Sequence, residues 1–354
     1  MVTVALDANG ADRGPAEVAA GAALAARQGI RVLLFAPRDA VGELAPGVEL
    51  IDAPVSIAKA ADPAFAVRNT PDASIVQAAR AVAEGRAQAL VSGGSTGSAL
   101  AAGLFNLKRD HGIYRPALAL TVPIPGGDPV TLLDVGANVT CRPEHLVQFA
   151  HMGSAFASAV MGIDRPRVAL LSNGEEPSKG TPELVEVHER LAGGAGSGLN
   201  FIGNVEGTQV TDGVADVVVM DGFTGNITLK LIEGVSGRTL RAIRDAARSS
   251  ARAKLGGLLI APTVRALRQQ IDPETTGGAY LLGLRQLGVV AHGRFTRRGF
   301  ARAIEVAARG VQEDVIGRTR EGLEHAGALR APHSGPEPDA QGGVSESAAT
   351  VSGR

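Results

Sequence analysis

The chain of 354 residues is 45% hydrophobic and carries a formal net charge of −1 at pH 7, so it can form a globular protein with a large buried core. The balanced charge and the aromatic content of 3% argue against nucleic-acid binding, which needs a basic surface and stacking side chains. No apolar run approaches the length of a membrane span and no basic leader follows Met1, so we expect a cytoplasmic protein.

The first expected unit is a strand, a polar loop and a helix. The apolar residues 2–6 predict a strand, and the loop after it contains Asp7 and Gly10. Pro15 then stands at a typical first position of a helix. Further elements are expected at residues 32–35 and 48–51, as strands, and at 72–84, as a helix.

A second polar loop follows a strand expected at residues 89–92, which ends at Ser92. Small and glycine residues make up this loop: Gly93, Gly94, Ser95, Thr96, Gly97 and Ser98. A helix is expected at residues 99–108. Small residues at the start of a helix let an anion reach backbone N–H groups, so this loop is a candidate phosphate site.

Three more strand ends carry polar loops. Asp134 ends the strand at residues 130–134, which follows another at 117–122, and Asn138 lies just beyond it. Pro143 then begins a long helix. The strand at residues 168–171 is followed by a loop that contains Asn173, Glu175 and Lys179. A short strand at residues 201–202 precedes Asn204.

The stretch 214–230 is the clearest of these junctions. Its β-branched run ends at Asp221, and a helix is expected to follow at once, with Thr224 and Asn226 as capping residues. Gly222 and Gly225 would let the backbone turn tightly and leave N–H groups free for an anion. An ordinary strand-to-helix turn is the alternative interpretation.

Alternating strands and helices predict an α/β protein with a doubly wound, mostly parallel sheet. Ligands of such sheets bind beyond the carboxyl ends of the strands, and every polar loop described above follows a strand. We therefore expect all of these loops to meet at one edge of the sheet. Residues 1–330 are expected to form a single catalytic domain.

Residues 230–272 are expected to project from this domain as a helical arm. A helix is predicted from residue 229 to about 250, with arginines on a face about 120° wide, namely Arg238, Arg241, Arg244, Arg248 and Arg252. The apolar, glycine-containing residues 255–262 predict a hinged tip before a second helix at 263–270. A surface helix with a solvated basic face is the alternative.

The C-terminal part is expected to close the domain and then lose order. Residues 281–284 and the stretch before His292 predict strands, and a closing helix is predicted from residue 298 to about 324. Residues 331–354 are rich in Pro, Ser, Gly and Ala, which predicts a disordered tail.

Five motifs in this order resemble the PlsX family, the bacterial phosphate acyltransferases of phospholipid synthesis, over residues 4–312. The motifs lie at residues 132–138, 143–148, 170–180, 200–207 and 221–226. The resemblance implies transfer of a fatty acyl group from acyl carrier protein to inorganic phosphate by a homodimer. It also implies the isopropylmalate-dehydrogenase-like α/β fold that phosphotransacetylases share.

Two loops depart from the pattern of that family. Asn9 and Ala11 replace a methionine and a glycine in the first loop, and Ser95 replaces an asparagine in the second, where Ser98 replaces an alanine. These departures leave open a paralogue that serves a specialised pathway.

The chemistry that the resemblance implies depends on placement of the reactants. Phosphate is a nucleophile near neutral pH, so attack on a thioester needs no strong general base. Lys179 would neutralise charge on phosphate or on the thioester oxyanion, with Asn226 and His145 as further candidates. His145 has an alternative, purely structural role at the start of its helix.

The remaining polar residues of these loops are expected to bind phosphate or the acyl group. Their carboxylates could orient loop amides and lysines or hold a substrate-bound cation. The set is Asp7, Gly10, Ser92, Gly94, Ser95, Thr96, Gly97, Asp134, Asn138, Asn173, Glu175, Asn204, Asp221, Thr224 and Gly225. We expect no resident metal and no cofactor.

Partner surfaces are expected on the arm. Arg241, Arg244 and Arg248 would recruit the acidic acyl carrier protein, and the apolar residues 258–260 would favour weak peripheral membrane contact or dimer contact. Three alternatives stay open: an acyl-enzyme on Cys141, an isopropylmalate-type NAD-dependent dehydrogenase, and a noncatalytic scaffold that binds the carrier protein.

Overall fold

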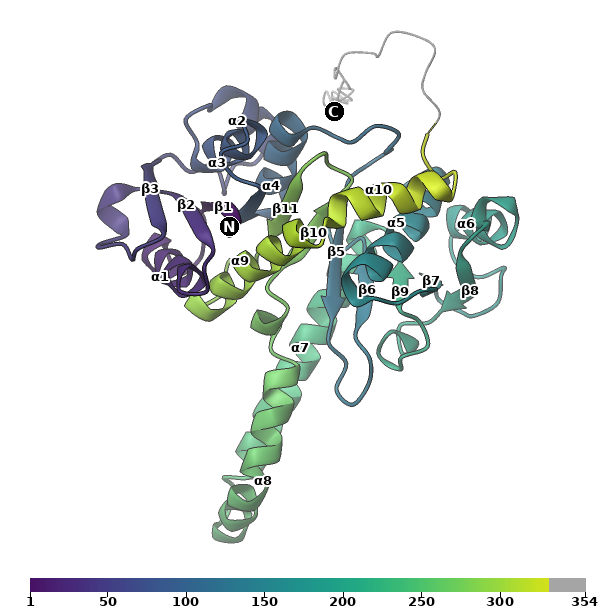
Figure 1. The fold of residues 1–354 in the computed structure, drawn as a ribbon. Coiled ribbons are helices and arrows are strands. Elements are labelled where there is room, and N and C mark those ends of the chain that lie inside the picture. Colours follow the sequence, from purple (N-terminus) through teal and green to yellow (C-terminus); the bar gives the residue numbers. More distant parts are fainter. Residues whose placement is uncertain (331–354) are drawn as a thin grey trace, which may run out of the picture.

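The computed structural model of the chain describes residues 1–330, so the disorder expected at 331–354 lies outside the described residues. An 11-stranded sheet forms its centre, with strand order β3-β2-β1-β4-β11-β10-β5-β6-β9-β7-β8. Helices cover both faces of this sheet, and a helical arm projects from it (Figure 1). The fold class expected from the sequence is confirmed.

One end of the sheet comes from the first part of the chain. Its strands are β1 (Thr3–Asp7), β2 (Arg31–Ala36), β3 (Val48–Asp52) and β4 (Ala89–Ser92). Its helices are α1 (Pro15–Ala26), α2 (Pro63–Asn69), α3 (Ser74–Ala83) and α4 (Thr96–Ala102), and a π turn at Gly103–Leu107 extends α4. Only α2 lacked a sequence prediction.

The other end comes from the middle of the chain. Its strands are β5 (Ala117–Val122), β6 (Val130–Leu133), β7 (Arg167–Leu171), β8 (Asn200–Val205) and β9 (Val217–Val219). The helices α5 (Pro143–Met161) and α6 (Pro182–Ala192) pack on it. The hairpin of β10 (Ala279–Leu282) and β11 (Leu287–Val290) joins the two ends.

Strand direction reverses across the centre of the sheet. The pairs β11–β10, β10–β5 and β5–β6 are antiparallel, whereas the pairs on either side of them are parallel. The carboxyl ends of β1 and β4 therefore leave one edge, and those of β6, β9 and β7 leave the opposite edge. The expectation that all polar loops meet at one edge is wrong.

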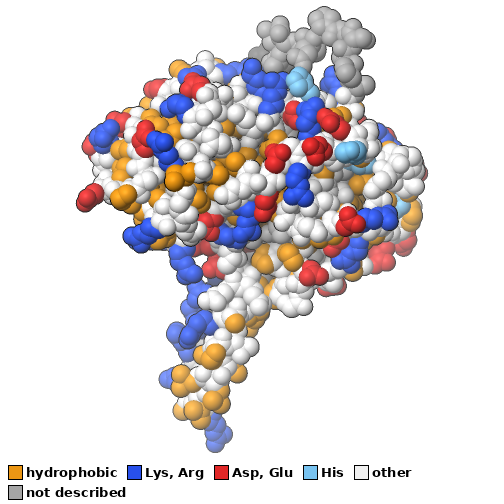
Figure 2. Space-filling view, viewed as in Figure 1, with side chains coloured by type: hydrophobic (Ala, Val, Ile, Leu, Met, Phe, Trp, Pro, Cys, Tyr) orange, Lys and Arg blue, Asp and Glu red, His pale blue; other side chains and the backbone are white. Residues whose placement is uncertain are grey.

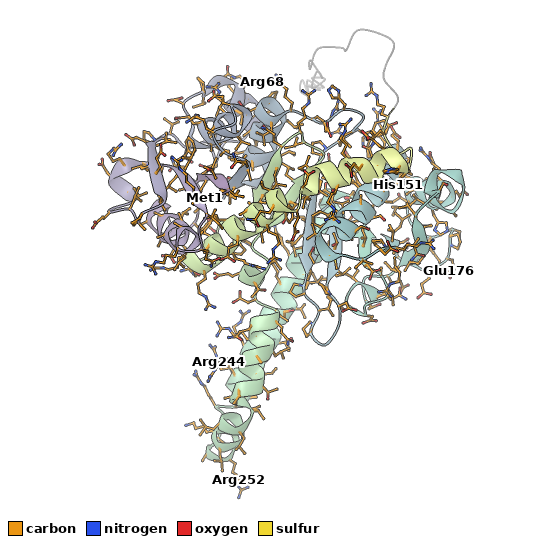
Figure 3. All side chains as sticks on the ribbon, viewed as in Figure 1. Met1, Arg68, His151, Glu176, Arg244 and Arg252 are labelled. Carbon is orange, nitrogen blue, oxygen red and sulfur yellow. The ribbon has the colours of Figure 1, made fainter. Side chains whose placement is uncertain are left out.

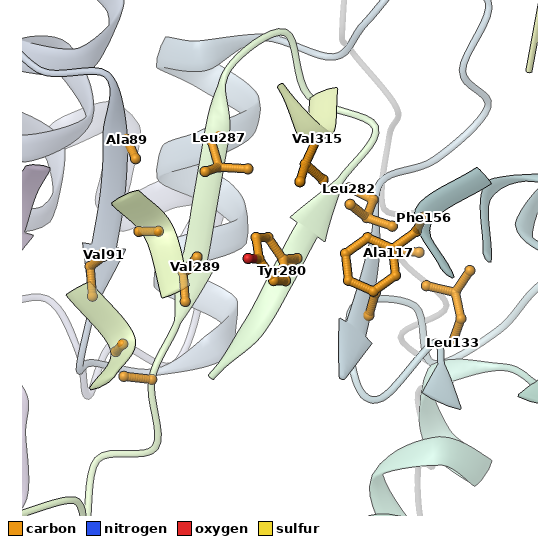
Figure 4. Packing of buried hydrophobic residues seen from close by; sticks show 14 of the residues in the cluster. Ala89, Val91, Ala117, Leu133, Phe156, Tyr280, Leu282, Leu287, Val289 and Val315 are labelled. Carbon is orange, nitrogen blue, oxygen red and sulfur yellow. The ribbon is translucent and has the colours of Figure 1, made fainter. Parts of the chain in front are cut away.

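Each face of the sheet has its own hydrophobic core. Helices α1, α5 and α6 cover one face together with the closing helices α9 (Arg297–Gln312) and α10 (Val315–His325). Helices α3, α4 and the first turns of α7 (Gly222–Ala246) cover the other. On the first face, Phe156 of α5 packs beside Leu133 and meets the Tyr280 ring at 5.2 Å between centroids (Figure 4).

The arm consists of α7 and α8 (Ala251–Gln270), and its turn lies at residues 247–250. The predicted hinge at residues 255–262 is instead helical. A Cβ on Gly257 would lie 2.9 Å from Cβ of Ala247, so this glycine allows α8 to pack closely on the turn that follows α7. Because α7 ends at Ala246, Arg252 belongs to α8 and to the end of the arm, not to the predicted basic face of one helix (Figure 3).

The single closing helix that the sequence predicts is divided. Asp314 adopts a left-handed conformation with φ of 48°, and its carboxylate caps α10 by accepting a hydrogen bond from the Gly317 N–H. This break separates α9, which packs on α1, from α10, which packs on α5.

Candidate active site

Asp134 organises the junction between β6 and α7. Its buried carboxylate accepts hydrogen bonds of 2.8–3.0 Å from the N–H groups of Leu118, Gly136, Ala137 and Asn138 and from the Asn138 side chain. Burial raises the pKa of Asp134, whereas the donated hydrogen bonds oppose the rise. Because all of these partners are N–H donors, they fit the ionised carboxylate.

The start of α7 lies directly against this loop. A Cβ on Gly225 would collide with the carbonyl oxygen of Asp134, and one on Gly222 would lie 2.7 Å from the Asn138 backbone. Both glycines are thus required by close packing. Asn226 also approaches the loop, since a Cβ on Gly136 would lie 3.9 Å from its Cβ.

The cap of α7 differs from the prediction. Asp221, rather than Thr224 or Asn226, is the N-cap residue, because its carboxylate accepts hydrogen bonds from the Thr224 N–H at 2.9 Å and hydroxyl at 2.7 Å. The Gly222 N–H donates to the Asn138 carbonyl at 2.7 Å. The Gly225 N–H donates to the Asp221 carbonyl at 2.9 Å, so three of the amides that were expected to be free for an anion are already used by the chain.

His145 and Cys141 lie beside the same junction. The His145 Nδ1 accepts a hydrogen bond from the Arg142 N–H at 3.2 Å, and burial, aided by the positive charge of Arg115, lowers the pKa of the imidazole. Burial and the nearby carboxylates of Asp134 and Asp221 raise the pKa of the Cys141 thiol to about 12. A neutral thiol is a poor nucleophile, which argues against an acyl-enzyme.

Arg115 also lies near the candidate site, although the sequence did not indicate it. It is exposed, and its charge acts on both His145 and Cys141. The expected site residues follow the carboxyl ends of strands, whereas Arg115 stands just before the amino end of β5. Because β5 is antiparallel to β6, that amino end lies beside the carboxyl end of β6.

Lys179 lies at the neighbouring strand end, since β7 pairs with β9. Its aliphatic stem covers Gly174, where a Cβ would lie 2.6 Å from the Lys179 Cγ. Among residues 1–330 it forms no ion pair. Glu183, its possible partner one turn away, instead bonds to its own backbone and Thr181, which lowers its pKa.

The other residues of this loop are fixed by side-chain contacts. The Asn204 side chain contacts His188 Nδ1 at 3.0 Å and donates to the Glu176 carbonyl at 3.0 Å. Glu175 accepts a hydrogen bond from Gln209, and Asn173 is exposed. These contacts tie the β7 and β8 loops together and leave the Lys179 ammonium exposed.

Asp7 and Ser92 form a second cluster at the opposite edge. The buried Asp7 carboxylate accepts hydrogen bonds from Ser74 at 2.6 Å and Ser92 at 2.9 Å. A Cβ on Gly10, whose φ is +117°, would lie 3.2 Å from the Gly94 Cα, so the two loops touch. Ser74, at the start of α3, had no predicted role.

The residues that depart from the family pattern make structural hydrogen bonds in this cluster. The Asn9 side chain donates to the Ala53 carbonyl at 2.7 Å. Ser95 caps α4 ahead of Thr96 and Gly97, and the Ser98 hydroxyl donates to the Ile57 carbonyl at 3.1 Å. Polar side chains at these positions therefore have partners within the chain.

Asp7 should make stability depend on pH. Burial raises its pKa from 3.8 to about 6, so the folded protein binds this proton more tightly than the unfolded chain does. The stabilisation is present below pH 3.8 and is lost as pH rises through 6, a change of about 3 kcal/mol. Asp7→Asn should gain stability relative to the parent over this range, measured by urea unfolding. Asp39→Asn, at an exposed position, is the control. If the difference in the free energy of unfolding between Asp7→Asn and the parent did not change with pH, the raised pKa of Asp7 would be wrong.

Neither of two cavities in the described chain is lined by the predicted site residues. The larger, about 660 Å³, lies between the end of α5 and α9 and includes Tyr280, Arg302 and Arg309. The smaller, about 110 Å³, lies between α7 and β5.

Comparison with known proteins agrees with these motifs. Residues 2–318 match the model of a family described as fatty acid synthesis protein. The chain is 43% identical over 327 residues to the phosphate acyltransferase of Heliobacterium modesticaldum, covering 90% of this chain and 96% of that protein. It is 40% identical over 328 residues to the phosphate acyltransferase of Pelotomaculum thermopropionicum, covering 91% and 95%.

Solved structures share the fold at low sequence identity. A phosphotransacetylase from Staphylococcus aureus matches with a TM-score of 0.55 and 18% identity, over 88% of this chain and 94% of that chain. A 4-hydroxythreonine-4-phosphate dehydrogenase from Klebsiella pneumoniae matches with a TM-score of 0.53 and 16% identity, over 88% and 100%. One fold thus carries both acyl transfer and dehydrogenation, so it does not decide between them.

Proposed function

Since the chain belongs to the PlsX family of fatty acid synthesis proteins, whose members include phosphate acyltransferases, we propose that it transfers a fatty acyl group from acyl carrier protein to inorganic phosphate. A phosphate oxygen attacks the thioester carbonyl carbon, a C–O bond forms, the C–S bond breaks, and the carrier thiolate leaves. The product is acyl phosphate for phospholipid synthesis. The family match over most of the chain carries this proposal.

We propose that the reaction takes place on the face of the sheet that α4 and α7 share. Both helices pack on the same face of the sheet, on either side of β10 and β5. Adjacent strands rotate by about 20–25°, so the four steps from β4 to β6 turn the two halves by roughly 80–100°. We propose that this twist lets loops from the two edges contribute to one site, with the Asp7 and Ser92 loops on one side of the substrates and the Asp134 junction on the other.

Individual roles follow from the contacts of each residue. Asp134 and Asp221 already accept hydrogen bonds from the chain, so they act by positioning the loop and α7. The exposed Lys179 ammonium would neutralise the developing oxyanion, with Asn226 as an amide donor. Neutral His145, whose Nδ1 accepts from the backbone, presents Nε2–H and could donate a hydrogen bond to the leaving sulfur.

An assay with carrier-protein thioester and phosphate tests this function. Acyl phosphate should form only when both are present, and adding NAD should produce no reduced cofactor. Intact mass spectrometry should show no acylated protein, and Cys141→Ser should stay active because the Cys141 thiol is protonated. Stoichiometric acylation of Cys141, or hydride transfer to NAD without acyl phosphate, would replace this proposal.

We also propose that the basic face of α7 recruits acyl carrier protein. Arg241 and Arg244 are exposed on α7, Arg248 is exposed in the turn after it, and basic side chains line one side of the arm (Figure 2). Arg241→Glu with Arg244→Glu should raise KM several-fold and flatten its salt dependence, because surface charge mainly steers encounter. Arg27→Glu with Arg38→Glu, elsewhere on the surface, is the control. An unchanged KM and salt slope would show that the face is only solvated.

The apolar part of α8 is proposed to support dimer or peripheral membrane contact. Leu258 and Leu259 are 73% and 77% exposed, with Leu255 and Ile260 nearby. No helix in residues 1–330 is long and apolar enough to cross a membrane. Leu259→Asp should reduce co-sedimentation with anionic liposomes or lower the dimer mass in light scattering. Parent-like results in both measurements would rule out both roles.

A further inference from the structure

A small cavity lies between the base of α7 and β5, at the edge of the sheet opposite the Asp134 junction. Its volume is about 110 Å³, well below the roughly 300–1,000 Å³ of pockets that hold a whole small molecule. It therefore suits only the end of a longer ligand. Apolar side chains form most of its wall, namely Leu120, Val122, Ile124, Leu229, Ile232 and Ile271.

The polar groups at this cavity are mostly engaged elsewhere. The Asp272 carboxylate accepts a hydrogen bond from the Glu274 N–H at 3.1 Å, and the Thr276 hydroxyl donates to the Pro273 carbonyl at 2.7 Å. Glu233 and Ser236 stand farthest along α7 from the catalytic end. A wall made mostly of apolar side chains selects a hydrocarbon rather than a charged headgroup.

The cavity shares one helix face with the candidate catalytic residues. Leu229, Ile232 and Ser236 line the cavity at the three- and four-residue spacing of a single face, and Asn226 lies three residues before Leu229 on the same side of α7. With a rise of about 1.5 Å per residue, Ile232 lies roughly 9 Å and Ser236 roughly 15 Å beyond Asn226 along the helix. An extended hydrocarbon advances about 1.3 Å per carbon, given C–C bonds of about 1.5 Å. An acyl group held at Asn226 would reach the cavity with about its seventh to twelfth carbon.

We propose that this cavity binds the methyl end of the fatty acyl chain and sets the chain length that the enzyme prefers. The inference rests on the proposed function and extends it to the substrate's apolar part. Leu229 and Ile232 are the specificity-determining residues, and Leu120 and Val122 of β5 complete the wall. Donors too short to reach Ile232 gain nothing from the cavity, whereas longer donors bury their last carbons in it.

Filling the cavity tests the proposal. The parent enzyme and Ile232→Trp are compared with acyl thioesters of six, twelve and sixteen carbons. Each buried CH₂ corresponds to roughly a fourfold change, so displacing about three carbons should lower kcat/KM for the longest donor on the order of 50-fold. Activity with the six-carbon donor should change less than about threefold, because a chain of about 8 Å ends before Ile232.

Two further variants make the result decisive. Val235→Trp carries the same side chain on the exposed side of α7, where Val235 is 57% exposed, and should keep the parent chain-length profile. Ile232→Ala enlarges the cavity and should shift the preference toward longer donors. A parent-like profile in both Ile232 variants, with activity retained, would overturn the acyl-end assignment alone. Absence of acyl phosphate from the parent with every donor would instead overturn the proposed function.

Discussion

Replacing Lys179 with methionine should lower kcat by about 10²- to 10³-fold without loss of folding. Its ammonium is exposed at the carboxyl end of β7, beside the strand that leads into α7, and it forms no ion pair within residues 1–330. Removing one preorganised group that stabilises an oxyanion costs about 3–4 kcal/mol of transition-state stabilisation. Steady-state kinetics measures the loss of kcat, and thermal unfolding shows whether the variant is still folded.

Three comparisons make this test specific. Lys254→Met removes an equally exposed lysine from α8 and should keep parental kcat. Lys179→Arg should restore activity only in part, because a broad guanidinium cannot replace a compact ammonium whose stem packs over Gly174. Retention of more than about a tenth of kcat in Lys179→Met would assign the loop a structural role.

Asp134→Asn should destabilise the fold by at least about 3–5 kcal/mol. The carboxylate accepts hydrogen bonds from five N–H donors, and the two on Oδ2 both come from Asn138. An asparagine amide would turn its own N–H₂ toward some of these donors. Hydrogen bonds to a charged group contribute about 1.5–3 kcal/mol each, and buried donors left without partners add a desolvation cost.

Urea unfolding of Asp134→Asn beside Asp72→Asn measures the effect. Asp72 is exposed, so its replacement should change the free energy of unfolding by less than about 0.5 kcal/mol. If Asp134→Asn matched Asp72→Asn in stability, the carboxylate would not be the element that orders this loop. Another group would then have to hold the loop against which Asn226 is positioned for catalysis.

Most secondary structure could be predicted because its signals are local. Pro15, Pro143 and Pro182 each begin a helix, and the buried strands appear as short apolar runs. Strand direction has no such signal, since side-chain alternation is the same whichever way a strand runs. The antiparallel pairing of β10, β5 and β6 therefore could not be predicted from the sequence. Because of this pairing, the Asp7 and Ser92 loops lie at the edge of the sheet opposite Asp134.

The candidate site was predictable in part for the same reason. Asp134, Asn138 and the glycines of α7 stand in local motifs, and the structure brings them together. Leu118 lies in β5 and Arg115 just before it, and only the folded sheet defines the position of this strand beside β6. Gly257 shows the opposite error, because a glycine that predicts a hinge can equally serve close helix packing.

The central hairpin also determines when the molecule can fold during synthesis. β10 and β11 fill the gap between β4 and β5, yet they come after the arm in the chain. As the nascent chain emerges, the facing edges of β4 and β5 keep unpaired N–H and C=O groups until about residue 290 has left the ribosome. Such open edges favour association with other chains, and long-range pairing is slow. A chain arrested before Ala279 should therefore aggregate and depend on chaperones, whereas the full chain closes its own sheet.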